Sequence, residues 1–228
     1  MAERLAGKVA LVVGGGSRFG QAVAAALARE GASVAVGCGD EASGCAAVAM
    51  VTAEGGVAQH VILDPTDRAS CAAAVEAAVA AFGRLDLLVT RVLSPLREPR
   101  PLEALSERDW EEALKHVVRA AVLPLTRALP EMARGAGGAV VVVGSTAGLV
   151  GRADGAAFAA AAAALIGLTR SAALECTRAG DRVRVNYLAA GEDAGEAAQA
   201  IVYLASDESR HLNGQVAVVE GGSVVVRS

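Results

Sequence analysis

The stretch KVALVVGGGSRFGQAVAAALAREG, residues 8–31, decides the fold of this chain. An apolar run at 9–13 leads into a glycine-rich turn at 14–20, and an alanine-rich stretch at 21–30 follows it, whose composition favours a helix. A strand, a glycine turn and a helix in this order are the context in which a glycine motif can bind a dinucleotide. The stretch therefore predicts the first βα unit of an α/β fold.

The same alternation continues along the chain. Short runs rich in β-branched residues predict strands at 9–13, 33–36, 60–63, 85–89, 139–144, 183–189 and 215–222. Alanine-rich stretches predict helices at 21–30, 41–54, 69–82, 106–134, 155–178 and 196–206. Strands this apolar on both faces are typical of a parallel sheet with helices on each side. We therefore expect residues 1–228 to form one α/β domain, a Rossmann-like doubly wound parallel sheet of about seven strands, with a ligand crevice at the carboxyl ends of the strands.

Composition excludes several classes of protein. The chain has 228 residues, a formal net charge of −4 and 3% aromatic residues, which does not support nucleic-acid binding. No strongly apolar run reaches the length of a membrane span, and the stretch MAERLAGKVALVVGG lacks the layout of a signal peptide, which predicts a cytoplasmic protein. The cysteines form no C-x-x-C pair and the histidines are scattered, so we expect no metal site from Cys38, Cys45, Cys71, Cys176, His60, His116 and His211.

Several stretches resemble the short-chain dehydrogenase/reductase family. They are GGGSRFG at 14–20, AVVVVGSTAGLVGRADGAAF at 139–158, RVRVNYLAAG at 182–191 and LASDESRHLNGQVAVVEGG at 204–222. The resemblance runs from end to end, and the closing segment is similar almost residue for residue. It implies the doubly wound fold, NAD(P) as cofactor, and hydride transfer assisted by an Asn–Ser–Tyr–Lys constellation.

The resemblance points to Gly14, Gly20 and Asp64 as residues for weak nucleotide binding. Gly14 and Gly20 fall on the outer glycines of the family pattern Thr-Gly-x-x-x-Gly-x-Gly, and Asp64 matches an aspartate that usually contacts adenine. Arg18 falls on the middle glycine, where we expect it to crowd the phosphates or to contact them through its charge. A gap of one residue would make Arg18 a phosphate ligand of the NADP type. The acid expected after the second strand is absent, since GCG occupies 37–39, and a glycine turn that binds nothing is the alternative.

The fourth strand also departs from the family pattern. LDLLVTRVL at 85–93 resembles the strand after which Asn-Asn-Ala-Gly normally stands. Small residues at that place leave room beside the cofactor. We therefore expect Arg91 and Leu93 to narrow the cleft, and Arg18 and Arg91 together to obstruct nucleotide binding.

Of the catalytic constellation, only Ser145 is retained. Phe158 stands thirteen residues after Ser145, where the tyrosine belongs, and Ala162 replaces the lysine. The counterpart of the asparagine is Val117 or Val118. Reduction of a carbonyl needs a proton donor, and phenylalanine is none, so we expect no catalytic residue and interpret Ser145 as a hydroxyl that caps the end of a strand.

The segment that closes over the substrate in the family is missing. RVRVNYLAAG at 182–191 resembles the end of the sixth strand, with Ala190 in place of a proline, and it is followed directly by a helical stretch. Exclusion of water from a hydride site depends on such a lid. The closing segment 204–222 and the long helices, which build the oligomer contacts in the family, are present.

Three interpretations follow, in this order. The first is a non-catalytic subunit that binds no NAD(P) itself and assembles with an active family paralogue into a hetero-oligomer, such as a tetramer, which carries NAD(P) and acts on hydroxyacyl or ketoacyl thioesters. The second is a cofactor-free cyclase, dehydratase or isomerase in the emptied pocket, with candidates His116, Ser145, Arg91 and Asp154. The third is an oxidoreductase that needs no partner and whose substrate donates its own proton.

Overall fold

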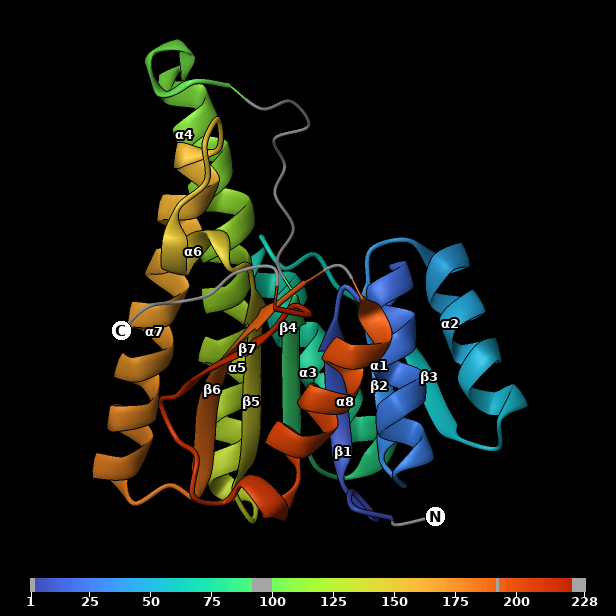
Figure 1. The fold of residues 1–228 in the computed structure, drawn as a ribbon. Coiled ribbons are helices and arrows are strands. Elements are labelled where there is room, and N and C mark those ends of the chain that lie inside the picture. The colour runs from blue at the N-terminus through green and yellow to red at the C-terminus, as the bar shows by residue number, and fades with distance from the viewer. Residues whose placement is uncertain (1–2, 92–99, 192, 223–228) are drawn as a thin grey trace.

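The strands of the described residues form one parallel sheet. The computed structural model describes residues 3–91, 100–191 and 193–222. In chain order the strands are β1 (Val9–Val13), β2 (Ser33–Cys38), β3 (Val57–Ile62), β4 (Leu87–Arg91), β5 (Gly138–Gly144), β6 (Val183–Ala190) and β7 (Val216–Val219). They pair in the order β3-β2-β1-β4-β5-β6-β7, and every pair is parallel (Figure 1). The predicted doubly wound sheet of seven strands is confirmed.

Helices cover both faces of this sheet because its strands are apolar on both sides. Along β1, Leu11 and Val13 belong to one apolar cluster, whereas Ala10 and Val12 belong to another. The first cluster is covered by α3 (Arg68–Phe82), α5 (Ala120–Arg134) and α7 (Ala156–Ala179), and the second by α1 (Arg18–Arg29), α2 (Glu41–Ala53) and α8 (Ala194–Ala205) (Figure 1). The remaining short elements are α4 (Glu107–Ala113), α6 (Ala147–Val150) and the 3₁₀ turns Leu102–Ala104 and Asp207–Ser209.

The helix predicted at 106–134 is not one uninterrupted α-helix. A π-helical segment, Leu114–Arg119, separates α4 from α5. The apolar spacing of the sequence does not distinguish this wider turn from an α-helical one, so it was not predicted. Figure 1 shows that α4 and the start of α7 extend beyond the carboxyl ends of the strands. Single π turns are frequent near functional sites.

Apart from β1, the strands begin or end one to three residues away from the predicted boundaries, and β3 and β4 differ most at their starts. β4 begins at Leu87, later than predicted, and the buried carboxylate of Asp86 just before it accepts hydrogen bonds from the backbone N–H of Val9 at 2.9 Å and from Arg84 Nε at 2.8 Å. β3 begins at Val57, earlier than predicted, because it is the edge strand and tolerates polar residues on its exposed positions.

Helix α7 has both a core face and an outward face. Within the described part of the chain, it is the one helix long and apolar enough to cross a membrane by length and composition. However, Ala161, Leu165 and Ile166 on its inner face belong to the first apolar cluster, which also contains Leu11 and Val13 of the sheet. We therefore interpret α7 as a core helix of the α/β domain.

Candidate functional site

The glycine turn wraps closely around the first turn of α1. Gly14 has a φ of +76°, which side-chain-bearing residues rarely adopt. A Cβ atom on Gly20 would lie 2.3 Å from the carbonyl oxygen of Gly14, so only glycine fits there. Ser17 caps α1: its Oγ accepts from the N–H of Gly20 at 3.1 Å and donates to the carbonyl of Gly14 at 2.8 Å. The turn thus leaves the N-terminal end of α1 open to an anion.

A cavity of about 540 Å³ lies beside this helix end. It is bounded by the starts of α1 and α8 and by the end of β4, with Arg18, Phe19, Ala22, Arg91, Asp193, Ala194 and Gly195 as lining residues. Two guanidinium groups and two helix N-termini give this cavity a positive field. The carboxylate of Asp193 partly opposes it but already accepts hydrogen bonds from the N–H groups of Gly195 and Glu196, at 2.8 and 3.0 Å.

Arg91 is folded over the aromatic ring of Phe19. The guanidinium carbon lies 3.9 Å from the ring centroid, and burial lowers the pKa of Arg91. Arg18, at the start of α1, is exposed. Both arginines line the cavity without filling it, so obstruction by Arg18 and Arg91 stays a prediction, and Leu93 lies outside the described residues.

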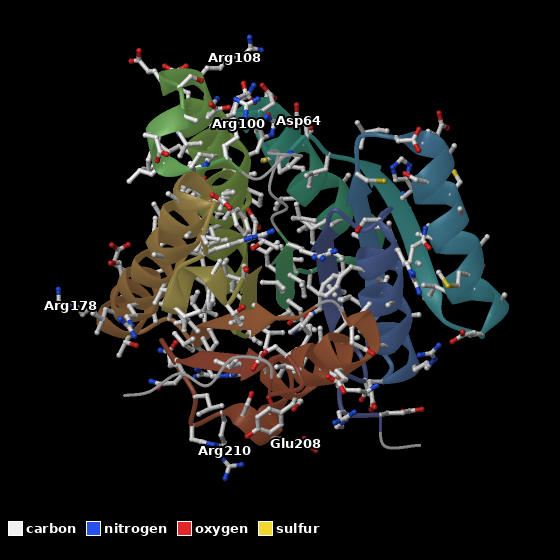
Figure 2. All side chains as sticks on the ribbon, turned by 45° about the horizontal axis from the view of Figure 1, so that its top comes forward. Asp64, Arg100, Arg108, Arg178, Glu208 and Arg210 are labelled. Carbon is white, nitrogen blue, oxygen red and sulfur yellow. The ribbon has the colours of Figure 1, made fainter. Side chains whose placement is uncertain are left out.

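Asp64 follows β3 and lies on the surface (Figure 2). Its Oδ1 accepts hydrogen bonds from the backbone N–H and the hydroxyl of Thr66, both at 2.8 Å, which lower the pKa of Asp64. Asp40 lies two residues beyond the end of β2, where the expected acid is absent, and caps α2 by accepting from the N–H of Ser43 at 2.8 Å. A role of Asp64 toward adenine stays a prediction.

Ser145 lies at the carboxyl end of β5, half-buried. Its Oγ accepts from the N–H of Ala147 at 3.1 Å, so its hydroxyl proton is available to donate. Its carbonyl oxygen accepts from the hydroxyl of Tyr187 at 3.0 Å. No role was inferred for Tyr187 from the sequence; the available signal was a single aromatic residue within the strand predicted at 183–189.

The buried phenol of Tyr187 predicts a stability change at alkaline pH. Burial raises the pKa of Tyr187 from 10.0 to about 12, so the neutral phenol stabilises the fold fully below about pH 10, and that stabilisation is lost as pH rises through 12. We expect the free energy of unfolding to fall by roughly 3 kcal/mol more in the wild type than in Y187F over this range, measured by urea unfolding. The Y203F variant, altered at the other tyrosine, is the control and keeps the wild-type slope. An equal fall of the free energy of unfolding with pH in the wild type and in Y187F would contradict a raised pKa of Tyr187.

The positions of the missing tyrosine and lysine lie on α7. Phe158 is half-buried and packs against the core cluster of α5 and α7. Ala162 is 1% exposed because α6 covers it: a Cβ atom on Gly148 would lie 2.8 Å from the carbonyl carbon of Ala162. Neither side chain can exchange a proton.

The π-helical segment holds the counterparts of the asparagine. Val117 is buried and Val118 half-buried. His116 Nε2 lies 3.0 Å from the carboxylate of Glu112, and both side chains are more than a third exposed, so His116 sits in a surface pair. Asp154 is exposed with a φ of +55°, and its carbonyl accepts from the N–H of Arg100 at 2.9 Å. The structure therefore does not bring His116, Ser145, Arg91 and Asp154 together into one cluster through any hydrogen bond or ion pair among the described residues.

The missing lid is visible in the short link between β6 and α8. β6 ends at Ala190, and α8 begins at Ala194 with Asp193 as its N-cap. The N–H of Gly191 donates to the carbonyl of Val219 at 2.8 Å, which ties the strand end to β7. The chain therefore has no long segment between β6 and α8 that could cover the cavity at the starts of α1 and α8.

Residues 8–202 match the family model described as short chain dehydrogenase. The chain belongs to the short-chain dehydrogenase/reductase family. It is 34% identical to cis-4-hydroxycyclohexanecarboxylate dehydrogenase of Sinomonas cyclohexanicum, over 99% of this chain and 100% of that protein. It is 32% identical to 2,5-dichloro-2,5-cyclohexadiene-1,4-diol dehydrogenase of Sphingobium indicum, over 97% and 98% of the two chains. A crystal structure of a short-chain dehydrogenase/reductase from Burkholderia xenovorans superposes with a TM-score of 0.88 at 36% identity, over 96% of this chain and 97% of that one.

These relatives correct two predictions from the sequence. The prediction of a non-catalytic subunit is wrong, because proteins that align over nearly the whole chain are named as dehydrogenases. The prediction that the chain binds no NAD(P) and leaves it to a partner is wrong for the same reason, since the matched family is one of NAD(P)-dependent dehydrogenases. Both predictions gave the side chains at 158 and 162 more weight than the turn at Gly14 and Gly20, whose backbone alone can receive a pyrophosphate. The alternative of a cofactor-free cyclase, dehydratase or isomerase is wrong for the same reason.

Proposed function

We propose that this chain is itself an NAD(P)-dependent oxidoreductase that interconverts a ring-borne secondary alcohol and its ketone. The observation that carries the proposal is the turn at Gly14 and Gly20, which holds the start of α1 open toward a cavity of about 540 Å³. This corresponds to the third interpretation of the sequence, in which proton transfer does not depend on a tyrosine and a lysine of the chain.

The described residues fit a dinucleotide. N–H groups at the start of α1 would hold the pyrophosphate. The guanidinium groups of Arg18 and Arg91, expected from the sequence to obstruct it, would instead bind it, because charge-assisted hydrogen bonds are strong. The absence of a side chain at Gly14 and Gly20 lets the backbone approach the phosphates closely. When bound, the nicotinamide supplies or accepts the hydride.

Ser145 would polarise the reacting oxygen of the substrate. Its Oγ already accepts from Ala147 N–H, so its proton can point to a carbonyl oxygen at the carboxyl end of β5. The proton that completes the alcohol then comes from the substrate or from solvent, since the side chains of Phe158 and Ala162 carry none. We expect slow turnover as a consequence.

The substrate class is taken from the named relatives. Two of them act, by name, on hydroxyl groups of six-membered carbon rings. A ring alcohol needs no long binding groove, which agrees with a site that has a short link between β6 and α8.

A second family chain as partner, in a hetero-oligomer, and a cytoplasmic location stay predictions. The outward face of α7 supports association with a second chain. Leu174 on this face is 60% exposed, and the exposed small residues Ala163, Ala164 and Gly167 would let a helix of that chain approach closely.

The direct test is oxidation of cyclohexane diols and hydroxycyclohexanecarboxylates by the purified chain with NAD⁺ and NADP⁺. We expect measurable turnover, and S145A to lower kcat/KM by about 10²-fold, as loss of one donor to a developing oxyanion does. Thr146 is also half-buried beside Ser145, and T146V is expected to change kcat/KM by no more than about twofold. Equal rates for S145A and the wild type would show that Ser145 does not face the reacting oxygen.

A further inference from the structure

We propose that Cys38 is a thiol-modification site, activated by His60, for low-molecular-weight disulfides, and that modification there hinders binding of the nucleotide. The second half of this proposal rests on the proposed function; the first half does not.

Three polar groups lie around the sulfur of Cys38, the last residue of β2. Cys38 Sγ lies 3.5 Å from His60 Nε2, 3.8 Å from Ser43 Oγ, and 3.3 Å from the carbonyl oxygen of Asp40. β2 and β3 are neighbours in the sheet, with Val36 opposite His60, which brings the imidazole to the end of β2.

The imidazole is held in a fixed orientation. His60 Nε2 lies 3.1 Å from the carbonyl oxygen of Cys38, which accepts and so favours the proton on Nε2. A Cβ atom on Gly44 would lie 2.2 Å from the ring, so the ring packs directly on the backbone of α2. The same N–H faces the sulfur and donates to it when the thiol has lost its proton.

The other cysteines lack this arrangement. Cys71 and Cys176 are buried, and burial raises the pKa of both thiols, that of Cys71 to about 11. Cys45 is exposed on α2, whereas Cys38 is half-buried among its partners. If exposure alone set the reaction rate, Cys45 would react faster than Cys38. A faster reaction of Cys38 would therefore be due to the groups around its sulfur.

Cys38 also contacts the glycine turn. A Cβ atom on Gly16 would lie 2.9 Å from Cys38 Sγ and 2.5 Å from Ser43 Oγ, so the sulfur packs against the backbone of the turn. A group attached to this sulfur must occupy the space beside the turn or displace it. In either case, the attached group would hinder the nucleotide that we propose to bind at the start of α1.

The chemical step is thiol–disulfide exchange with oxidised glutathione. The thiol of Cys38 gives its proton to solvent, and the thiolate attacks one sulfur of the disulfide. The S–S bond of glutathione disulfide breaks as the Cys38–glutathione bond forms. The leaving thiolate takes a proton from solvent, so Cys38 is oxidised and one glutathione is reduced.

The first test measures rates of glutathione attachment at Cys38 and Cys45 in the folded full-length chain, by peptide mass spectrometry at pH 7. We expect Cys38 to react at least about threefold faster, since the imidazole of His60, 3.5 Å from the sulfur, can donate a hydrogen bond to it as it attacks. H60L should lower the Cys38 rate to that of Cys45, whereas H60Q, which keeps an N–H donor, should restore part of it. A Cys38 rate at or below that of Cys45 in the wild type, or an unchanged rate in H60L, would overturn the proposal.

The second test compares NADPH and NADH affinity before and after modification, in a C45S background. We expect modified protein to bind at least about tenfold more weakly, with recovery after reduction by dithiothreitol. Equal affinities would refute the link between Cys38 and the nucleotide. If the unmodified chain binds no nucleotide, the proposed function fails, and the rates of the first test still decide whether Cys38 is the modification site.

Discussion

The variant F158Y should oxidise a ring alcohol about 10²- to 10⁴-fold faster than the wild type. A positioned general acid or base contributes this much, and the wild type has phenylalanine where the family has its tyrosine. Phe158 is half-buried at the start of α7, so one added hydroxyl changes the packing little. The measurement is kcat/KM with NAD⁺ or NADP⁺ in saturating amount.

The matched control is F82Y, because Phe82 is also half-buried but ends α3 at the opposite end of the sheet. Its rate should equal that of the wild type. A162K in the F158Y background should raise the rate further, but Gly148 of α6 packs closely on Ala162, so this variant needs a thermal unfolding measurement beside the assay. An F158Y rate equal to that of F82Y would show that position 158 does not reach the reacting oxygen.

The variant G20A should lose nucleotide binding, with affinity at least about 10²-fold weaker than in the wild type. Its methyl group would lie 2.3 Å from the carbonyl oxygen of Gly14 and 2.6 Å from the Cα of Gly15, and both are backbone atoms that cannot move without changing the turn. The N–H groups at the start of α1 would then be displaced from the phosphates.

Gly167 provides the control for this substitution. It lies on the exposed face of α7, and a Cβ atom there meets nothing within 4 Å. G167A should keep full affinity and gain up to about 1 kcal/mol of stability, since alanine favours a helix over glycine. Unchanged nucleotide affinity in a folded G20A protein would contradict the placement of the nucleotide.

The sequence predicts the sheet well because its signals are local. Apolar runs such as 9–13 and 139–144 are bounded by glycine turns and helical stretches, and each became a strand. The π-helical segment at 114–119 was not predictable, because its apolar spacing resembles that of an α-helix. The hydrogen bond from the Val9 N–H to the buried carboxylate of Asp86, beside the start of β4, was likewise not predictable, because the two residues are distant in sequence.

The site was predicted only in part for a similar reason. Gly14, Gly20 and Ser145 could be named because each lies in a short local stretch, 14–20 or 139–158, that resembles the family. The packing of Arg91 on Phe19 and the hydrogen bond from Tyr187 to Ser145 join separate strands and helices, and only the folded structure brings them together. Weighing the chemistry of single side chains above the backbone of the turn led to the wrong prediction of a chain without its own cofactor.

The most direct measurement is a fluorescence titration of the purified chain, free of other family proteins, with NADH and NADPH. We expect saturable binding of at least one of them with a Kd on the order of micromolar. No binding up to about millimolar nucleotide by the correctly folded wild-type chain would contradict the claim that this protein carries its own cofactor.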